Sequence, residues 1–357
     1  MKTRFIISGG GTGGHIFPAV AIANALRKRV DGCEILFVGA NGRMEMEKVP
    51  NAGYKIRGLN IAGFQRTAIW KNWSLPFKII SSEWDAIKIL KSFKPHAAIG
   101  VGGYASGPLL FGATLCGIPT LIQEQNSFAG VTNRILSRFA KKICVAYSGM
   151  DRVFPKEKVI LTGNPVRAEI LQNKVNRSEA LHYFGLSESV KTIFVSGGSL
   201  GARTLNESVD AFLNESGHEN VQIIWQTGKT WQKADRKLPQ VRQLVFIEKM
   251  EMAYAAADVI ISRAGALSVS ELQNIGKPVI LVPSPNVTDD HQTHNAMALV
   301  HRQAAILVKD AEAKLKLMNT ALALLQDDKQ TAALSANIAA MAISNAAERI
   351  VDEILSL

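Results

Sequence analysis

Cysteine is scarce in this chain, and so are the patterns that bind metals. The 357 residues include only three cysteines, Cys33, Cys116 and Cys144, which lie far apart. Their odd number argues against a disulfide scaffold and their spacing against a zinc site, so we expect a reducing, cytoplasmic environment. The first apolar run is too short for a secretory signal peptide.

Several catalytic patterns are missing as well. The sequence has no H-E-x-x-H zinc motif, no complete P-loop and no D-x-D pair that would hold a divalent cation. Without such a metal motif, a protein that binds a nucleotide diphosphate must neutralise its charge with backbone N–H groups and helix dipoles. We therefore expect no metal site and no required cofactor.

One long stretch lacks charge without having the form of a membrane span. Residues 95–123 contain no Asp, Glu, Lys or Arg, but glycines at 100, 102, 103, 107, 112 and 117 and prolines at 108 and 119 interrupt them. A membrane-spanning helix needs about 20 continuous apolar residues. The pattern instead predicts a buried strand, loop, helix and second strand.

Acidic residues are few in the first half of the chain. The net charge is +11, yet residues 1–165 carry 22 Lys and Arg against 9 Asp and Glu, while residues 166–357 carry 19 against 21. The first half therefore favours an acidic partner, such as a phosphorylated ligand, anionic lipid or nucleic acid. Because no recognised nucleic-acid motif is present, nucleic acid ranks last.

Short apolar runs alternate with helical patterns along the chain, which is typical of α/β domains with parallel sheets. A turn signal at residues 163–165 separates two such series. We expect domains at 1–164 and 165–341, and a final helix at about 342–357 that packs back on the first domain. The predicted strands are 5–7, 34–39, 54–59, 97–101, 119–123 and 142–147, then 192–196, 221–226, 244–247, 258–262, 278–282 and 304–308.

Glycine is concentrated where each series begins. Five of the six residues 9–14 are glycine, between the run 5–7 and a helical pattern that Pro18 opens. Residues 196–198, Ser-Gly-Gly, repeat residues 8–10 near the middle of the chain. A strand that turns through glycine into a helix is an anion site, most often for phosphate. His15 lies at the edge of the first turn and can carry a proton.

The first glycine turn also contains G-x-G-x-x-G, the dinucleotide fingerprint. That fingerprint needs an acidic residue at the end of the second strand to bind the ribose. Residues 38–41 of this sequence read V-G-A-N and supply none. The sequence therefore disfavours NAD.

Further polar and glycine-rich segments follow predicted strands, where ligands bind in open α/β sheets. In the first half these are residues 102–107 and 124–126, and in the second half 262–271 and 289–295. Glu271 either acts as a helix cap or dipole partner, or accepts hydrogen bonds from a ribose diol. Asp289 or Asp290 is expected as an N-cap, while His291 and Gln292 can still face a cleft.

Residues 64–94 mix aromatic and basic side chains, and three of the five tryptophans fall there. Such a composition is typical of a surface that rests on anionic lipid. Most of the apolar residues, including Ile79, Ile80 and Trp84, are expected on the core face of an amphipathic helix. Surface exposure is expected for Ile69, Trp70 and Trp73.

Taken in order, several segments closely resemble the MurG family, the membrane-associated N-acetylglucosaminyltransferases of bacterial peptidoglycan synthesis. They are GGGTGGHIFPA at 9–19, GVGGYASGP at 100–108, QEQNSFAGVTN at 123–133, TGNPVR at 162–167, GGSLGAR at 197–203, SRAGALSVSE at 262–271 and DDHQTHNA at 289–296. The resemblance implies a GT-B fold, in which two Rossmann-like domains with parallel sheets face each other across a cleft.

The resemblance also implies a reaction. N-acetylglucosamine (GlcNAc) passes from UDP-GlcNAc to the 4-hydroxyl of N-acetylmuramic acid (MurNAc) in lipid I, undecaprenyl-diphosphate-MurNAc-pentapeptide, and forms lipid II with inversion. The first domain would face acceptor and membrane, and the second would bind UDP-GlcNAc. The implied location is the cytoplasmic face of the cell membrane, as a peripheral protein beside other cell-wall synthesis and division proteins. The alternative is a UDP-GlcNAc 2-epimerase of the same fold.

The family's functional positions carry over residue by residue. His15 is the candidate general base, with orientation of a diphosphate as its alternative role, and Asn126 is a second catalytic candidate. Gly11, Gly103 and Tyr104 are expected at the acceptor. The positions expected to bind UDP-GlcNAc are Thr12, Gly13, Gly14, Asn126, Arg167, Ser199, Ile247, Ala266, Leu267, Ser268, Val269, Ser270, Glu271 and Gln292.

Overall fold

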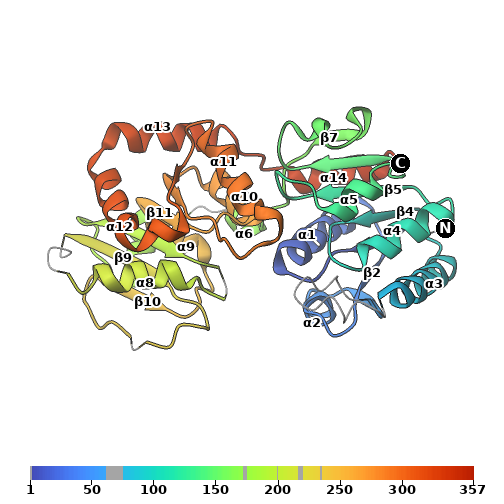
Figure 1. Ribbon diagram of the computed structural model, residues 1–357, viewed down its shortest axis with the longest axis horizontal. Helices are drawn as coiled ribbons and strands as arrows, with labels where there is room; N and C mark the ends of the chain where they lie inside the picture. Colours follow the sequence, from blue (N-terminus) through green and yellow to red (C-terminus); the bar gives the residue numbers. More distant parts are fainter. Residues whose placement is uncertain (1, 62–74, 172–174, 199, 216–219, 234) are drawn as a thin grey trace. The chain divides into compact units, whose positions relative to one another are not determined.

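The computed structural model describes the chain except for residues 1, 62–74, 172–174, 199, 216–219 and 234. Its internal contacts divide the chain into two units (Figure 1). The N-terminal unit comprises Met1–Val166 and Ser344–Leu357, and the C-terminal unit comprises Arg167–Ile343. Each unit is built on one parallel sheet covered by helices.

Within the described residues, the N-terminal unit has a sheet of seven parallel strands in the order β3-β2-β1-β4-β5-β6-β7. The order reverses direction at β1, so β1 and β4 are neighbours although β2 and β3 lie between them in sequence. The strands are β1 (Arg4–Ser8), β2 (Glu34–Ala40), β3 (Lys55–Leu59), β4 (Ala97–Gly100), β5 (Thr120–Glu124), β6 (Lys142–Val145) and β7 (Val159–Leu161).

Helices cover both faces of this sheet, because alternate residues of each strand point to opposite sides. Phe5 and Ile7 of β1 pack into a core shared with α1 and α14, whereas Ile6 packs into a core shared with α3 and α4. The helices are α1 (Gly13–Arg29), α2 (Glu45–Asn51), α3 (Leu75–Phe93), α4 (Ser106–Leu115), α5 (Val131–Leu136) and α14 (Ala346–Leu355), with 3₁₀ turns η2 (Met150–Arg152) and η3 (Lys156–Lys158).

The described part of the C-terminal unit has a sheet of six parallel strands in the order β10-β9-β8-β11-β12-β13. The strands are β8 (Lys191–Ser196), β9 (Val221–Gln226), β10 (Val241–Leu244), β11 (Val259–Ser262), β12 (Val279–Leu281) and β13 (Ile306–Leu307). The helices are α6 (Ala168–Leu171), α7 (Arg177–Phe184), α8 (Arg203–Phe212), α9 (Met250–Ala256), α10 (Ala266–Ile275), α11 (His291–Val300), α12 (Asp310–Gln326) and α13 (Asp328–Ala339), with the turn η4 (Thr288–Asp290).

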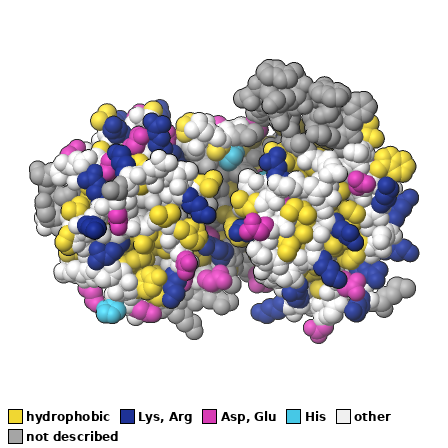
Figure 2. Space-filling model, turned by 90° about the horizontal axis from the view of Figure 1, so that it is seen from below, with side chains coloured by type: hydrophobic (Ala, Val, Ile, Leu, Met, Phe, Trp, Pro, Cys, Tyr) yellow, Lys and Arg dark blue, Asp and Glu magenta, His cyan; other side chains and the backbone are white. Residues whose placement is uncertain are grey.

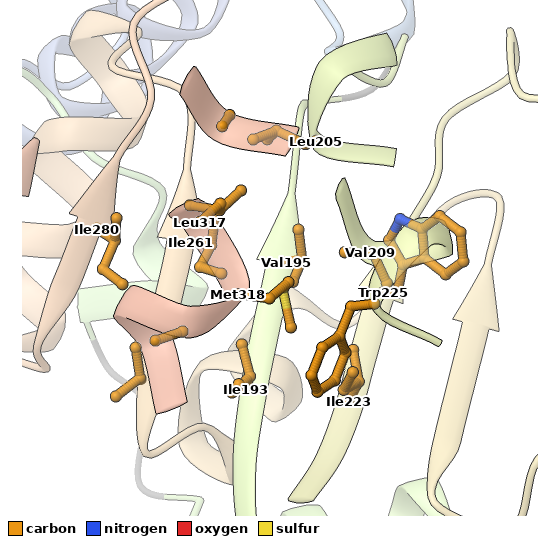
Figure 3. Close-up of a cluster of buried hydrophobic side chains, with 14 of the residues drawn as sticks. Ile193, Val195, Leu205, Val209, Ile223, Trp225, Ile261, Ile280, Leu317 and Met318 are labelled. Atoms are coloured by element: carbon orange, nitrogen blue, oxygen red, sulfur yellow. The ribbon is translucent and has the colours of Figure 1, made fainter. Parts of the chain in front are cut away.

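One core of the C-terminal unit lies between this sheet and helices α8 and α12 (Figure 3). Ile193 and Val195 of β8 face Leu317 and Met318 of α12 there. Trp225 of β9 is fully buried, and its indole N–H donates to Asn206 Oδ1 at 2.9 Å. The indole thus fills core volume without leaving its polar atom unpaired.

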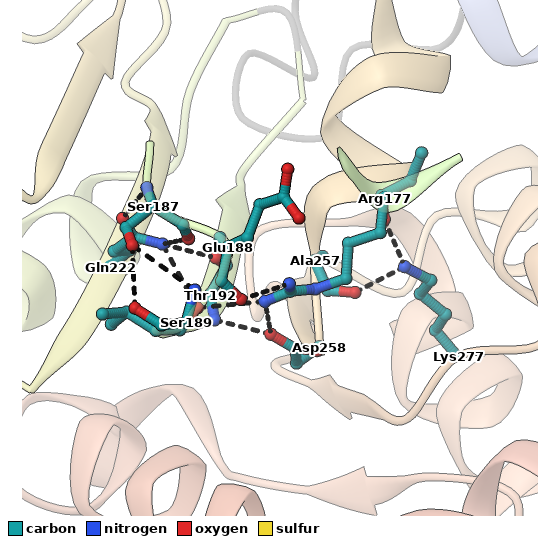
Figure 4. Close-up of polar contacts among 11 residues, drawn as sticks. Arg177, Ser187, Glu188, Ser189, Thr192, Gln222, Ala257, Asp258 and Lys277 are labelled. Atoms are coloured by element: carbon teal, nitrogen blue, oxygen red, sulfur yellow. Dashed lines mark hydrogen bonds and ion pairs between the residues drawn. The ribbon is translucent and has the colours of Figure 1, made fainter. Parts of the chain in front are cut away.

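A polar network ties together the amino ends of strands in the C-terminal unit (Figure 4). Asp258, just before β11, accepts from the Arg177 guanidinium at 3.0 Å and from the Thr192 N–H at 2.7 Å. Lys277 donates to the carbonyl of Ala257. These contacts lie at the amino-terminal edge of the sheet, opposite the edge where ligands bind, so we assign them to stability.

The strands match the sequence expectation closely, with three local differences. The run expected at 244–247 forms a strand earlier, as β10, and the short strand β7 was not expected at all. Helix α1 begins at Gly13, so Pro18 lies inside the helix instead of opening it. Glycine-rich sequence hides a helix start, because glycine has a low helix propensity and only the fold supplies the stabilising contacts.

Two helices of the N-terminal unit bear on the sequence expectations. Helix α14 packs against α1 in the N-terminal unit. Helix α3 buries Ala86 and Leu90, but Ile79, Ile80 and Trp84 are 47%, 60% and 64% exposed. The expectation that these three side chains face the core was wrong, because the packed stripe of α3 is formed by other residues.

The charge-poor segment 95–123 forms β4, α4 and β5, as its glycines and prolines predict. Across the described ranges, no helix combines the length and apolarity that crossing a bilayer requires. Basic side chains instead stand among exposed hydrophobic ones on the N-terminal unit, the right-hand part of the view in Figure 2.

Glu83 of α3 makes a testable contribution to stability. One of its carboxylate oxygens is buried against Gly112 of α4 and has no hydrogen-bond partner in the described structure. Burial raises the pKa of Glu83 from its ordinary 4.5 to about 7. The folded chain therefore binds this proton more tightly than the unfolded chain, and stability falls as pH rises from about 4.5 through 7.

We expect Glu83→Gln to raise the free energy of unfolding at pH 8 by roughly 1 kcal/mol, a value reduced for partial solvation. The gain should shrink toward pH 5. Urea unfolding at both pH values measures it, with Asp85→Asn on the same helix as control, since the Asp85 side chain is 46% exposed. Equal gains for Glu83→Gln at pH 5 and pH 8 would contradict this account.

Candidate active site

Both sheets place their most unusual segments at the carboxyl ends of two neighbouring central strands. In the N-terminal unit these are β1 and β4, which lead into residues 9–15 and 101–106. In the C-terminal unit they are β8 and β11, which lead into residues 197–202 and 263–266. Ligands of open α/β sheets bind at such positions, where the strand order reverses.

The two glycine turns of the N-terminal unit touch each other through their backbones. The Gly10 N–H donates to the Gly102 carbonyl at 3.2 Å. A Cβ on Gly103 would lie 2.5 Å from the Gly10 carbonyl oxygen, and Gly103 has φ +91°. Only glycine meets both demands, since other residues rarely adopt this φ and a methyl group does not fit.

His15 lies over this contact. Its Nδ1 is 3.0 Å from the Gly10 carbonyl oxygen and 3.3 Å from Thr12 Oγ1. Because a carbonyl only accepts, the neutral ring carries its proton on Nδ1, which leaves the lone pair on Nε2. Nε2 lies against Gly102, 2.8 Å from the place of an added Cβ. A side chain at position 102 would displace the imidazole.

Glu45 is a neighbour of this turn that the sequence analysis did not identify. It is 1% exposed, and its carboxylate accepts the N–H of Gly11 at 2.8 Å and the N–H of Ala40 at 3.0 Å. Its oxygen would collide with a side chain on Gly10. The glycine turn therefore does bind an anion, but the anion at Gly11 is the protein's own carboxylate. The sequence did contain a signal for Glu45, namely an acidic residue a few positions after the second strand. The dinucleotide fingerprint places its acidic residue at the end of that strand, so Glu45 did not match it.

The polar segment after β5 is mainly structural. Glu124 is buried and accepts from the Asn126 N–H at 3.0 Å, from the Gly130 N–H at 3.2 Å and from the Asn133 amide at 2.8 Å. Gln125 is buried and donates to the Val101 carbonyl at 2.6 Å. These bonds shape the loop, and of the three polar residues Asn126 is the half-buried one.

Tyr104 extends from the second glycine turn. It is 45% exposed, with the Arg43 guanidinium carbon 5.5 Å from the centre of its ring. Among the other predicted positions of this unit, Thr12 and Gly14 are exposed, and Gly11 and Gly13 are half-buried. The structure thus brings Gly11, His15, Gly103 and the carboxyl ends of β1 and β4 together.

In the C-terminal unit, Gln226 holds the glycine turn after β8. Its side-chain amide donates to Ser196 Oγ at 3.2 Å and to the Gly198 carbonyl at 3.1 Å. Its oxygen accepts the Ile247 N–H at 2.9 Å. Gln226 is 3% exposed and was not among the predicted residues. It fixes Ile247, which is itself buried, beside the turn.

Helix α10 starts at the carboxyl end of β11 with no side-chain cap and no acidic residue in its first turn. Ala266, Leu267 and Ser268 of that turn are half-buried, while Val269 and Ser270 are buried. The first N–H groups of a helix have no intrahelical partner and favour an anion. This ten-residue helix therefore directs its positive end toward the ligand edge of the sheet.

Glu271, one turn further along α10, is held from two sides. The Arg167 guanidinium binds it with two hydrogen bonds, Nε to Oε1 at 2.7 Å and Nη2 to Oε2 at 2.9 Å. The Tyr254 hydroxyl donates to Oε2 at 3.2 Å. Glu271 is thus neither an N-cap nor a first-turn dipole partner. Sequence reasoning did not identify Tyr254, which lies in α9 and meets Glu271 only in the fold.

The segment before α11 differs from a simple N-cap. Asp289 and Asp290 have positive φ, 53° and 46°. Asp290 stands at the N-cap position, but its carboxylate accepts the Thr293 hydroxyl at 2.7 Å instead of a backbone N–H. Gln292 is half-buried, and its oxygen accepts the Ser284 N–H at 2.9 Å, which joins α11 to the loop after β12.

Four predicted residues lie outside the described part of the chain. They are Ser199 in the C-terminal glycine turn and the expected surface residues Ile69, Trp70 and Trp73. Nothing in the described ranges gathers three or more His, Cys, Asp or Glu side chains into a group that could hold a metal ion.

Comparison with known proteins decides the family. Residues 5–145 match the glycosyltransferase family 28 N-terminal domain, and residues 192–350 match the family 28 C-terminal domain. This chain belongs to glycosyltransferase family 28. The first match covers most of the N-terminal sheet, and the second covers the C-terminal sheet and continues into α14 of the N-terminal unit.

Relatives within family 28 match over the whole chain. A Bacteroides thetaiotaomicron protein, named UDP-N-acetylglucosamine–N-acetylmuramyl-(pentapeptide) pyrophosphoryl-undecaprenol N-acetylglucosamine transferase, is 54% identical and covers 100% of this chain and 98% of its own. A crystal structure of Acinetobacter baumannii MurG covers 100% of both chains at 31% identity, with a TM-score of 0.80. The resemblance to the MurG family and the expected GT-B, α/β fold are confirmed.

The fold extends beyond this family. A crystal structure of UDP-GlcNAc 2-epimerase from Neisseria meningitidis bound to UDP-GlcNAc covers 100% of both chains with a TM-score of 0.67, at 16% identity. At that identity the likeness shows the fold alone.

Glu45 provides a test of how the family 28 glycine turn is held. We expect Glu45→Gln to lower the free energy of unfolding by about 1–3 kcal/mol, because one amide oxygen cannot replace both carboxylate oxygens and the NH₂ group faces a backbone N–H. Denaturant titration measures the loss. Glu47→Gln on the same helix, with a side chain 71% exposed, is the matched control. Similar midpoints for the two variants would refute the role assigned to Glu45.

Proposed function

We propose that this chain transfers GlcNAc from UDP-GlcNAc to the 4-hydroxyl of MurNAc in lipid I and so forms lipid II for peptidoglycan synthesis. The observation that carries the proposal is the match of 54% identity over the full chain with a transferase whose name states this donor and acceptor. The family 28 domains at 5–145 and 192–350 agree with an enzyme of this class.

We assign the donor to the C-terminal unit. The uncapped start of α10 offers N–H groups to the diphosphate, and Arg167 adds a positive charge. Glu271 accepts hydrogen bonds from the ribose hydroxyls. The backbone near Ile247 and the side chain of Gln292 border the nucleotide. The assignment is completed by residues of the family motifs, namely Ser199, Ala266, Leu267, Ser268, Val269 and Ser270.

We assign the acceptor to the N-terminal unit, where Gly11, Gly103 and Tyr104 surround the ligand edge of β1 and β4. The half-buried glycines have no side chain that would keep a diphosphate away from the backbone, and the excess of Lys and Arg in residues 1–165 suits a diphosphate lipid. Thr12, Gly13, Gly14 and Asn126 are the positions that family resemblance assigns to the donor from this unit.

The reaction is an in-line displacement with inversion. The MurNAc 4-hydroxyl oxygen forms a bond to C1 of GlcNAc while the bond from C1 to the UDP oxygen breaks. His15 Nε2 takes the hydroxyl proton, since its lone pair is directed by the Nδ1 contact with the Gly10 carbonyl. The negative charge of departing UDP is stabilised by the α10 N–H groups and Arg167.

We further propose that the N-terminal unit docks on an anionic membrane as a peripheral protein at its cytoplasmic face. This proposal is supported by the packing of three helices. Helix α3 contacts α4 and α4 contacts α5, and the three helices carry many exposed apolar side chains. Arg134 and Arg138 border a hollow in that surface. We call it the α3–α5 surface; its exposed residues are Ile79, Ile80, Trp84, Phe111, Leu115, Val131, Ile135 and Phe139.

The activity is tested with labelled UDP-GlcNAc and a short-chain lipid I analogue in the presence of EDTA. We expect a labelled disaccharide lipid, with turnover unchanged by EDTA because no step above uses a metal. A new sugar formed from UDP-GlcNAc alone, without acceptor, would favour the epimerase alternative. Absence of any product with the acceptor present would refute the proposal.

In the same assay, His15→Gln tests the base. We expect kcat to fall by roughly 100- to 10,000-fold, with little change in KM for UDP-GlcNAc, because a glutamine amide does not accept the proton. Turnover close to wild type with both substrates saturating would remove His15 from the role of base.

Membrane docking is tested by sedimentation with vesicles that contain phosphatidylglycerol. We expect the Ile80→Ala, Trp84→Ala double variant to lose most vesicle binding and to keep its activity on the soluble acceptor analogue. Leu315→Ala is the control, because Leu315 is 80% exposed on α12 of the C-terminal unit. Equal binding by the double variant and wild type would overturn the docking surface.

A further inference from the structure

We propose that Tyr254 is a positioning residue for donor recognition, which holds the Glu271 carboxylate ready for the ribose of a uridine diphosphate. The inference rests on the proposed function, in which Glu271 accepts the ribose hydroxyls. Tyr254 itself touches no substrate in this proposal. It acts through one hydrogen bond, from its hydroxyl to Glu271 Oε2 at 3.2 Å.

The two partners of Glu271 differ in how firmly they are placed. The side chain of Arg167 is 41% exposed, whereas that of Glu271 is 10% exposed. Tyr254 is 5% exposed, and its ring packs edge-on against Phe194 of β8 with centroids 5.5 Å apart. Arg167 can therefore move into solvent, while the core holds Tyr254 in place.

The hydrogen-bond capacity of the carboxylate explains why this difference matters. A carboxylate offers about four lone-pair positions, and Arg167 and Tyr254 together use three. A ribose diol that brings two donors must displace at least one existing bond. The guanidinium is the partner that gives way, because its side chain is 41% exposed and water can hydrate it, whereas the Tyr254 ring is buried in the core.

Tyr254 is also chemically suited to remain the fixed donor. Burial, together with the charge of Glu271, raises the pKa of Tyr254 well above its ordinary value of 10. The hydroxyl stays protonated at neutral pH and keeps donating. With this bond in place, Glu271 retains its side-chain rotamer when Arg167 leaves, so the ribose meets a preorganised acceptor.

The test measures binding of UDP and of 2′,3′-dideoxy-UDP by calorimetry, which needs no acceptor and no turnover. We expect Tyr254→Phe to weaken UDP binding about five- to tenfold, because the carboxylate loses one fixed donor. With 2′,3′-dideoxy-UDP, which has no ribose diol, wild type and Tyr254→Phe should bind equally. Tyr254→Phe should weaken UDP binding less when it is added to Glu271→Gln than when it is added to wild type.

Tyr147→Phe is the matched control. Tyr147 is also buried, but its hydroxyl lacks a hydrogen-bond partner within the described structure. Its removal should leave UDP affinity unchanged and the thermal midpoint equal or higher. Tyr147→Phe should keep the wild-type difference in affinity between UDP and 2′,3′-dideoxy-UDP. It therefore separates the loss of a buried hydroxyl from the loss of the Glu271 contact.

Two outcomes would overturn the inference. One is unchanged UDP affinity in Tyr254→Phe, and the other is an equal loss of affinity for UDP and for the dideoxy analogue, which would indicate a general structural role. If Tyr254→Phe unfolds, the wild-type difference between the two ligands still decides whether the diol contributes. Failure of wild type to bind UDP at all would refute the proposed function instead.

Discussion

Close contact between backbone segments at glycine is the constraint on which both candidate sites depend. In the N-terminal unit, Gly103 lies so near Gly10 that a Cβ would meet its carbonyl oxygen at 2.5 Å. In the C-terminal unit, a Cβ on Gly201 would lie 2.0 Å from the Thr227 carbonyl oxygen. Each contact brings the loops after two adjacent strands together without side chains between them.

This constraint has a chemical consequence. Where side chains are absent, backbone N–H and carbonyl groups and the starts of helices line the ligand edge of the sheet. The Gly10 carbonyl is one example, because it accepts from His15 and thereby determines which ring nitrogen holds the lone pair. The charge that a diphosphate needs can then come from dipoles and from arginine, in a site without a metal motif.

Three buried carboxylates show how similar groups take different roles. Glu45 and Glu124 direct both oxygens at backbone N–H groups or side-chain amides of the protein itself, so their hydrogen-bonding capacity is used within the protein. Glu271 instead pairs with an arginine that is partly exposed, and this partner can be exchanged. Whether a buried carboxylate can serve a ligand thus depends on how mobile its present partners are.

Much of this protein was readable from its sequence. Apolar runs predicted most strands, glycines identified the turns, and the ordered motifs indicated the MurG family, because these features depend on local spacing and residue type. Tertiary structure decided the rest. Glu45, Gln226 and Tyr254 meet their partners only across the fold. The fold also selects which side of α3 packs against its neighbours, and Ile80 and Trp84 lie on the side left exposed. Contacts between residues distant in sequence leave no periodic signal, so no local pattern could reveal them.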